Sequence, residues 1–224
     1  MSKNNILTPE VLNLEEALKK VVDLSVASKI KFVESIDIAI NLGIDAKQSD
    51  QMVKGSLVLP QGSGKKVRVL VFTADEEIKK IALSSGAAFA GLEDLIKQIE
   101  GGFLDFDCCI ATPDVMQKIS KVARKLGPRG LMPSPKNGTV TKDVKKAIED
   151  ALKGRVDFRN DKAGIVHCLV GKANFEFEAL LENVKSVVKA IKEAKPEGSK
   201  GRYIKGFYIN STMGLAVKVS TQAL

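Results

Sequence analysis

The sequence predicts a two-domain protein that combines α+β and α/β architecture. Near both ends of the 224-residue chain, polar and apolar residues alternate along the expected strands, which is typical of a sheet with one face toward water. In the middle, short strands that are apolar throughout alternate with helices, as in a parallel sheet covered on both faces. We therefore expect one split α+β domain, residues 1–63 with 155–224, and an inserted three-layer α/β domain, residues 64–154.

The chain begins with an expected helix and a long strand. Residues 15–25 place apolar side chains at helical spacing. From residue 31 to residue 42 the pattern becomes alternating, with Phe32 and several aliphatic residues on one face. Glu34 interrupts this apolar face. The pattern predicts a strand with one apolar face and one face exposed to water.

A glycine-lysine stretch follows, in the sequence LVLPQGSGKKVRVLVFT of residues 57–73. A phosphate-binding P-loop would need a glycine where Leu59 stands and a serine or threonine where Lys66 stands, and it would open a helix. Here the next segment reads as a strand. We therefore interpret Gly62 and Gly64 as a hinge between the two domains.

The inserted domain is expected to alternate strands with helices, which implies right-handed crossovers and a parallel sheet. Thr112 and Pro113 have the residue types of a helix N-cap and first helical position, for a helix that runs toward Lys125. The last helix ends at Gly154, where the chain crosses back. The expected order is strand 67–72, helix 76–86, strand 87–91, helix 92–102, strand 105–112, helix 113–125 and helix 141–154.

The alternating pattern returns after the second crossing. Two strands, 155–161 and 164–171, are expected around a turn, and an amphipathic helix spans 177–196. Two further strands, 202–211 and 215–220, flank a Thr-Met-Gly turn and read as a hairpin.

The composition favours a polyanionic partner. Lys and Arg number 35 against 27 Asp and Glu, which gives a net charge of +8 and a pI near 9.3. The sequence lacks an apolar run of membrane-spanning length and begins with a polar segment, so we expect a cytoplasmic protein without a membrane partner. The three cysteines form no C-x-x-C pair and are expected to be buried thiols.

Few residues suit catalysis or metal binding. His167 is the single histidine, and its neighbour Cys168 would point to the opposite face of a strand, which argues against a Cys-His dyad. We predict no catalytic residue, no metal and no cofactor. The proline-rich segment RKLGPRGLMPSPKNGT, residues 124–139, is an ordered loop whose cations are either solvated or in contact with a ligand. Those cations include Arg124, Arg129 and Lys136.

Several long motifs resemble the bacterial ribosomal protein L-one family. They are KFVESIDIAINLGIDAKQSDQMVKGSLVLPQGSGKKVRVL, FDCCIATPDVM, LGPRGLMPSPKNGTV, FRNDKAGIVHCLVGKANF, KPEGSKG and STMG, in the expected order from about residue 15 to the end. The resemblance implies a split two-layer α+β domain with a Rossmann-like domain inserted into it. It also implies a protein of the mobile stalk of the large ribosomal subunit.

The resemblance further implies partners and site residues. The partners are large-subunit rRNA, the messenger RNA of the protein's own operon and exit-site tRNA, with the free protein a monomer. The RNA-binding residues carried over are Lys31, Phe32, Glu34, Asp161, Lys162, His167, Gly171, Lys172, Ser211, Thr212, Met213 and Gly214. Arg124, Arg129 and Lys136 of the proline loop are expected to make secondary contacts. The chain departs from the family pattern in a shorter, less basic beginning, in Ser134 and in Asn174.

Two other function classes remain open from the residues alone. One is a nucleotide- or anion-binding α/β enzyme that uses the inserted domain, although G-x-G-x-x-G, a complete P-loop and a metal cluster are all absent from the sequence. The other is a scaffold with protein partners only, which would show no salt-sensitive RNA binding.

Overall fold

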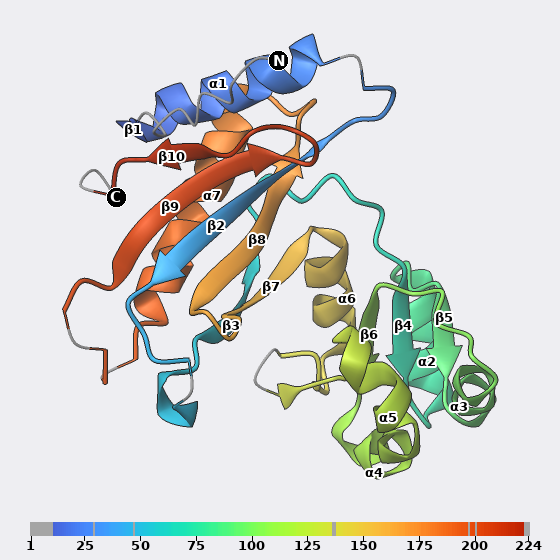
Figure 1. Ribbon diagram of the computed structural model, residues 1–224. Helices are drawn as coiled ribbons and strands as arrows, with labels where there is room; N and C mark the ends of the chain where they lie inside the picture. Colours follow the sequence, from blue (N-terminus) through green and yellow to red (C-terminus); the bar gives the residue numbers. More distant parts are fainter. Residues whose placement is uncertain are drawn as a thin grey trace. The chain divides into compact units, whose positions relative to one another are not determined.

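The computed structural model describes residues 11–28, 30–46, 48–135, 138–196, 198–199 and 201–221. The chain divides into two compact units, which are coloured along the sequence in Figure 1. The terminal unit comprises Met1–Gly64 and Val156–Leu224, and the inserted unit comprises Lys65–Arg155.

The terminal unit has two layers, a five-stranded sheet and two helices on one of its faces (Figure 1). β1 runs parallel to β10, and the other neighbours are antiparallel. α1 (Leu14–Ala27) and α7 (Phe177–Glu193) are the two helices. Across the sheet the strand order is β1 (Val11–Leu12), β10 (Val217–Val219), β9 (Ile204–Ser211), β2 (Ser35–Leu42) and β8 (Ile165–Lys172).

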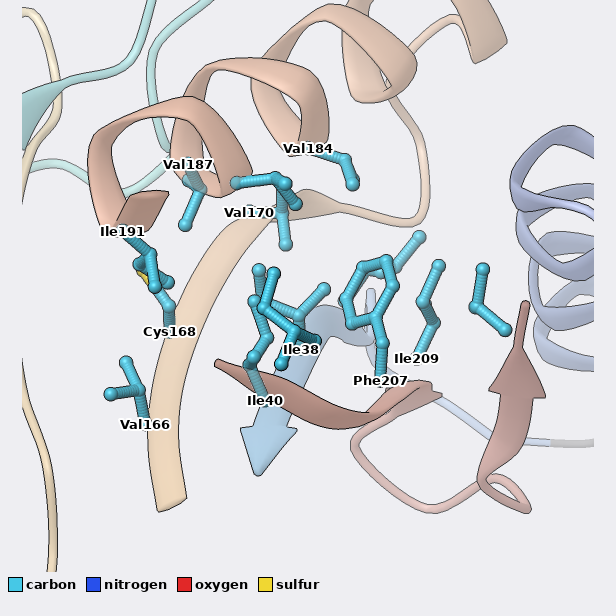
Figure 2. Packing of buried hydrophobic residues seen from close by; sticks show 14 of the residues in the cluster. Ile38, Ile40, Val166, Cys168, Val170, Val184, Val187, Ile191, Phe207 and Ile209 are labelled. Carbon is cyan, nitrogen blue, oxygen red and sulfur yellow. The ribbon is translucent and has the colours of Figure 1, made fainter. Parts of the chain in front are cut away.

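The core of this unit follows from the period of two along its strands. On β2 the aliphatic residues at even-numbered positions are buried, while the residues between them are half-buried on the opposite face. Figure 2 shows the buried side chains of β2, β8 and β9 packed toward those of α7. Each fully buried aliphatic side chain stabilises the fold by roughly 1.5–3 kcal/mol. The labelled residues are Ile38, Ile40, Val166, Cys168, Val170, Val184, Val187, Ile191, Phe207 and Ile209.

The strand expected from residue 31 begins at Ser35 instead. Phe32 lies before the strand and is 55% exposed, so it is not a core residue although it falls on the apolar face of the pattern. Residues 31–33 take no part in the ladders of β2, which start with the pairs Ser35–Lys172 and Ile36–Ser211. Without cross-strand partners, alternation alone did not make this segment a strand.

A second, two-stranded sheet joins β3 (Lys54–Val58) to β7 (Arg155–Arg159). We had no expectation for β3, and β7 pairs with it rather than with β8, to which only the bridge Asn160–Val166 connects this segment. The Oδ1 atom of Asn160 accepts a hydrogen bond from the backbone N–H of Val53 at 2.9 Å. Gly55 leaves room for the ring of Phe158, since a Cβ there would lie 2.6 Å from its Cζ atom. These contacts attach β7 to β3.

The inserted unit is a three-layer α/β structure, which confirms the predicted fold class. Its parallel sheet has the order β5 (Phe89–Gly91), β4 (Val69–Phe72) and β6 (Cys108–Ala111). One cluster of buried residues joins the sheet to α2 (Glu76–Ser84) and α6 (Val144–Leu152). A second cluster joins the other face to α3 (Glu93–Glu100), α4 (Met116–Ile119) and α5 (Ala123–Leu126).

The helix expected from Thr112 toward Lys125 is broken into short pieces. Single 3-10 turns, Pro113–Val115 and Ser120–Val122, flank α4, and a third, Gly127–Arg129, follows α5. The Ser120 hydroxyl donates to the carbonyl of Met116 at 3.1 Å, a local bond of the kind that bends helices. The pattern predicted the location of this segment but not its breaks.

The glycine-lysine stretch leads directly into β4, and no helix opens there, so a P-loop geometry is absent. Cys109 and Cys168 are buried free thiols, as expected, whereas Cys108 is half-buried. Burial raises the pKa of Cys168 to about 12 and that of Cys109 still higher, so both remain protonated at neutral pH. Within the described residues, no helix is long and apolar enough to cross a membrane, and no cluster of three metal-ligating side chains is found.

Candidate nucleic-acid interface

Three segments that are far apart in the sequence meet at Ser35, the first residue of β2. The backbone N–H of Ser35 donates to the Thr212 hydroxyl at 2.9 Å, and the backbone N–H of Thr212 donates to the Ser35 carbonyl at 3.0 Å. The ammonium group of Lys172 donates to the Ser35 hydroxyl at 2.7 Å. The beginning of β2, the end of β8 and the β9–β10 turn therefore form one corner of the sheet, which we call the Ser35 corner.

Glu34 is a buried carboxylate inside this corner, with 2% of its surface exposed. Its Oε1 atom accepts the backbone N–H of Met213 at 2.9 Å, and its own carbonyl accepts the N–H of Ala173 at 2.9 Å. The hydroxyl of Ser25, the Met213 amide and the Ser211 hydroxyl hold the pKa of Glu34 below its usual value, against the effect of burial. Glu34 is therefore an ionised side chain that fixes the β9–β10 turn.

Gly214 is required where the turn packs on Ser211. A Cβ atom at position 214 would lie 2.2 Å from the Ser211 hydroxyl oxygen, far inside contact distance. Ser211 is 1% exposed, and its hydroxyl, which contributes to the lowered pKa of Glu34, makes no hydrogen bond of standard geometry within the described residues. The close packing leaves no space for a larger residue in the turn.

Exposed side chains surround this rigid frame. Lys31 and Thr212 are exposed, and two large apolar side chains, Phe32 at 55% and Met213 at 69%, face water. Large apolar side chains that are exposed close to a cation are suited to contact with a partner. Val33 and Leu215 are also exposed beside these residues in the sequence, and our sequence analysis did not include them.

Asp161 and Lys162 lie at the opposite end of β8 from the Ser35 corner. β8 pairs with β2 from Ile165 to Lys172, a span of about 24 Å at the usual rise per residue. The Oδ1 atom of Asp161 accepts the backbone N–H groups of Ala163 and Ile165, each at 2.8 Å, and these bonds lower its pKa. Asp161 therefore holds the turn before β8, and it is not brought together with Thr212.

His167 lies between the two ends of β8. Its side chain is 64% exposed, and its Nε2 atom is 3.8 Å from Asp161 Oδ2. Gly171 is buried, because a Cβ atom there would lie 2.8 Å from the Leu180 side chain on α7. Its place in the structure is explained by packing of the sheet on the helix.

The proline loop belongs to the inserted unit. Arg124 and Arg129 are exposed, whereas Lys136 lies outside the described residues. Thr139 holds the loop, since its hydroxyl accepts the N–H of Ser134 at 2.8 Å and donates to the Ser134 carbonyl at 3.1 Å. These two hydrogen bonds hold part of the loop in one conformation, and the exposed Arg124 and Arg129 belong to the same segment.

Comparisons with known proteins agree with the architecture. The family model described as "Ribosomal protein L1p/L10e family" matches residues 18–215. The chain belongs to this family. Similar curated proteins are each named "Large ribosomal subunit protein uL1". The relatives from Nitrosomonas europaea and Methylobacillus flagellatus are each 50% identical over 96% of this chain and 92% of the relative. The relative from Coxiella burnetii (strain Dugway 5J108-111) is 49% identical over 92% of this chain and 87% of the relative.

Membership of the L1p/L10e family confirms the predicted resemblance and places the chain among structural ribosomal proteins, which are not enzymes. The alternative of a nucleotide- or anion-binding enzyme is therefore wrong. Lys65 of the glycine-lysine stretch pairs with Asp107 at 2.6 Å, so its position is explained without a phosphate.

Sequence reasoning missed two residues of this candidate interface. Ser35 joins all three segments, and Ser25 on α1 is the largest cause of the lowered pKa of Glu34. A signal for Ser35 was present, because it is the first polar residue of the wet face of β2 and directly follows the buried Glu34. No pattern in the sequence pointed to Ser25.

Proposed function

We propose that the chain binds large-subunit rRNA through the Ser35 corner of the terminal unit. The observation that carries this proposal is the hydrogen-bonded frame of Glu34, Ser35 and Thr212, which fixes the backbone next to the exposed side chains of Phe32 and Met213. Family membership supports rRNA as the partner, because the relatives are named as proteins of the large ribosomal subunit.

The chemistry of the corner suits folded RNA. Such RNA is recognised by its shape, its 2′-hydroxyl groups and its unstacked bases, so a preorganised surface serves better than a flexible cationic tail. Lys31 and Lys172 supply positive charge for phosphates, while Phe32 and Met213 supply apolar surface for a sugar or base. The net charge of +8 adds a salt-sensitive attraction without sequence preference.

The finer parts of the function follow from the resemblance. We propose that the bound protein forms the mobile stalk near the exit-tRNA site of cytoplasmic ribosomes, and that the free protein is a monomer. We also propose that it represses translation of its own messenger RNA, through a structure that resembles the rRNA site. Arg124, Arg129 and Lys136 are proposed as secondary contacts to RNA, with Arg124 and Arg129 exposed on the inserted unit.

Mobility of the stalk protein would use the two chain crossings. Gly62, Gly64 and Gly154 have φ angles of +73°, +68° and +98°, a region that favours glycine. On one side of the first crossing, Asn183 of α7 donates to the carbonyl of Gly62 at 3.0 Å. On the other side, Lys65 pairs with Asp107. We propose that rotation at this crossing is confined to the few bonds between Gly62 and Lys65.

The experiment is filter binding to a stalk-region rRNA fragment and to an unrelated folded RNA, over a salt series. We compare the wild type with Phe32→Ala and Met213→Ala, and use Leu83→Ala as the control, since Leu83 is an apolar residue of α2 that is 49% exposed. We expect each corner variant to lose about tenfold in affinity for the stalk fragment, while the slope against salt stays the same. The control should bind as the wild type does.

A wild type that binds both RNAs equally, with affinity set by salt alone, would overturn the proposed site. Binding would then be a consequence of net charge. Selective binding that neither variant weakens would place the specific contacts elsewhere on the chain.

A further inference from the structure

The face of the five-stranded sheet opposite α1 and α7 carries a carboxylate that the proposed rRNA site does not use. β2 lies between β8 and β9 (Figure 1), and Asp37 on β2 pairs with Leu169 and Asn210 of these strands. It is half-buried, and it makes no hydrogen bond or ion pair of standard geometry with another described residue. Burial raises the pKa of Asp37, while Lys172 and His167 act in the opposite direction. A half-buried carboxylate has lost part of its hydration, and a ligand with N–H donors would compensate for that loss.

The next row of the same face has the form of a stacking platform. Ala39 lies between His167 on β8 and Tyr208 on β9, and Lys218 on β10 follows Tyr208. The small Ala39 leaves space between the two rings. The Tyr208 ring lies along the sheet, since a Cβ atom at Gly206 would be 3.1 Å from its Cε2 atom. Aromatic rings on an open antiparallel sheet with helices behind it are a common surface for stacking bases of single-stranded RNA.

The platform is continuous with the Ser35 corner. Ser35 and Asp37 alternate on the same face of β2, and Lys172 reaches Ser35 from β8. A strand of RNA that leaves the corner would thus pass Lys172 before it reaches Asp37. The charge of Lys172 suits the phosphate of such a strand.

We propose that this face binds one unpaired guanine, with the base stacked on the Tyr208 ring above the row of His167 and Ala39 and its Watson–Crick edge on Asp37. Guanine fits because its N1–H and N2–H groups are two neighbouring donors, which match the two oxygens of a carboxylate. Cytosine and adenine offer an amino group alone on that edge, and a carboxylate repels a nucleotide that brings only acceptors. Asn210, whose amide donates to the Ser211 carbonyl at 3.3 Å, pairs directly with Asp37 and adds a second polar side chain to this row. This inference rests on the proposed RNA binding and adds base specificity to it.

The test uses the whole chain and four pentanucleotides at low salt: UUGUU, UUIUU with inosine, UUCUU and UUAUU. Affinities and backbone amide shifts of Asp37, Ala39 and Tyr208 are followed by NMR titration. We expect UUGUU to bind about tenfold more tightly than the other three, because inosine lacks the N2 amino group. The changes in backbone amide chemical shift should be largest at Asp37, Ala39 and Tyr208.

Variants separate edge recognition from stacking. Asp37→Asn should lose the preference for guanine, while Asp23→Asn on α1, behind the sheet, should keep it. Tyr208→Ala should weaken all four RNAs about tenfold, and Tyr208→Phe should not. Equal affinity of the wild type for the four RNAs, or a guanine preference that survives Asp37→Asn, would overturn the inference. Thermal unfolding checks that each variant is folded.

Failure of the inference and failure of the proposed function give different results. If the wild type binds the stalk fragment selectively but shows no guanine preference, only the platform is wrong. If selective binding of the stalk fragment is itself absent, the proposed function fails first.

Discussion

The backbone N–H of Met213 donates to the Oε1 atom of Glu34 at 2.9 Å, across 179 residues of the chain. Glu34 directly precedes β2, and Met213 lies in the turn between β9 and β10, so one bond joins the two ends of the split unit. The acceptor is a carboxylate, which makes the bond stronger than one between neutral groups. Because only the backbone of Met213 is used, its side chain is left free for a ligand.

Glu34→Gln tests whether the charge of this acceptor stabilises the fold. The pKa of Glu34 is lowered from 4.5 in the folded protein, so the ionised form favours folding. Its contribution is present above pH 4.5 and is lost as the pH falls through the lower folded-state pKa. We expect Glu34→Gln to be less stable at pH 7, and the difference from the wild type to shrink in acid.

Urea unfolding at a series of pH values from 7 to about 3 measures this difference. Glu178→Gln on the exposed side of α7 is the control for the loss of one charge. A difference between Glu34→Gln and wild type that stays constant with pH would show that the ionised carboxylate has no such role.

Gly214→Ala and Ser211→Ala form a double-mutant cycle across the turn. Gly214→Ala places a Cβ atom 2.2 Å from the Ser211 hydroxyl and is expected to cost about 1–3 kcal/mol. Ser211→Ala removes a buried hydroxyl that makes the smallest contribution to the lowered pKa of Glu34, so its own cost should be the smaller of the two. The double variant should recover much of the loss, because the clashing atom is gone. Chemical denaturation of the four proteins gives the coupling energy, and additive costs would contradict the clash.

The sequence predicted the fold well where the spacing of the apolar residues agrees with the residues that end helices and strands. Alternation along β2 predicted its buried and open faces, and fully apolar β4 and β6 predicted a sheet covered on both sides. The wrong details arise from contacts distant in sequence. β7 pairs with β3, next to the hydrogen bond from the backbone N–H of Val53 to the side chain of Asn160. Phe32 is exposed because its segment has no partner strand in the ladders of β2.

The candidate site was less predictable than the fold. The resemblance named Glu34 and Thr212, but Ser35, the residue that joins the three segments, was missed because its role depends on a register between distant strands. Local pattern also could not show that Asp161 lies at the far end of β8 from Thr212. Period gives the face of a strand on which a residue lies, and only the pairing of strands gives its neighbours.

Asn183→Ala tests how the first chain crossing is held. Asn183 is fully buried on α7; it donates to the carbonyls of Gly62 and Val170 at 3.0 and 2.8 Å and accepts the N–H of Gln61 at 3.1 Å. The variant leaves three backbone groups without this partner, and we expect a loss of about 2–4 kcal/mol in the free energy of unfolding. Equilibrium unfolding in urea measures it. As a control, Asn174→Ala changes an exposed asparagine and should cost far less. Equal losses would show that the hydrogen bonds of Asn183 do not hold the crossing.

Gly64→Ala and Gly154→Ala test the proposed hinge. Both glycines have positive φ angles, where a Cβ costs about 1–2 kcal/mol, and a Cβ at Gly64 would also lie 2.9 Å from the side chains of Lys172 and Phe175. We expect these variants to restrict the backbone at the crossings and to narrow the distribution of distances between fluorescent labels on α7 and α3.

Gly102→Ala is the matched control, because Gly102 has a φ of +100° but lies within the inserted unit, with no atom within 4 Å of the added Cβ. It carries the same local strain without a place at a crossing, so its distance distribution should equal that of the wild type. Single-molecule energy transfer compares the three variants. If Gly64→Ala and Gly154→Ala leave the distribution unchanged, the units move about other bonds; if Gly102→Ala narrows it equally, the effect is strain and not hinge restriction.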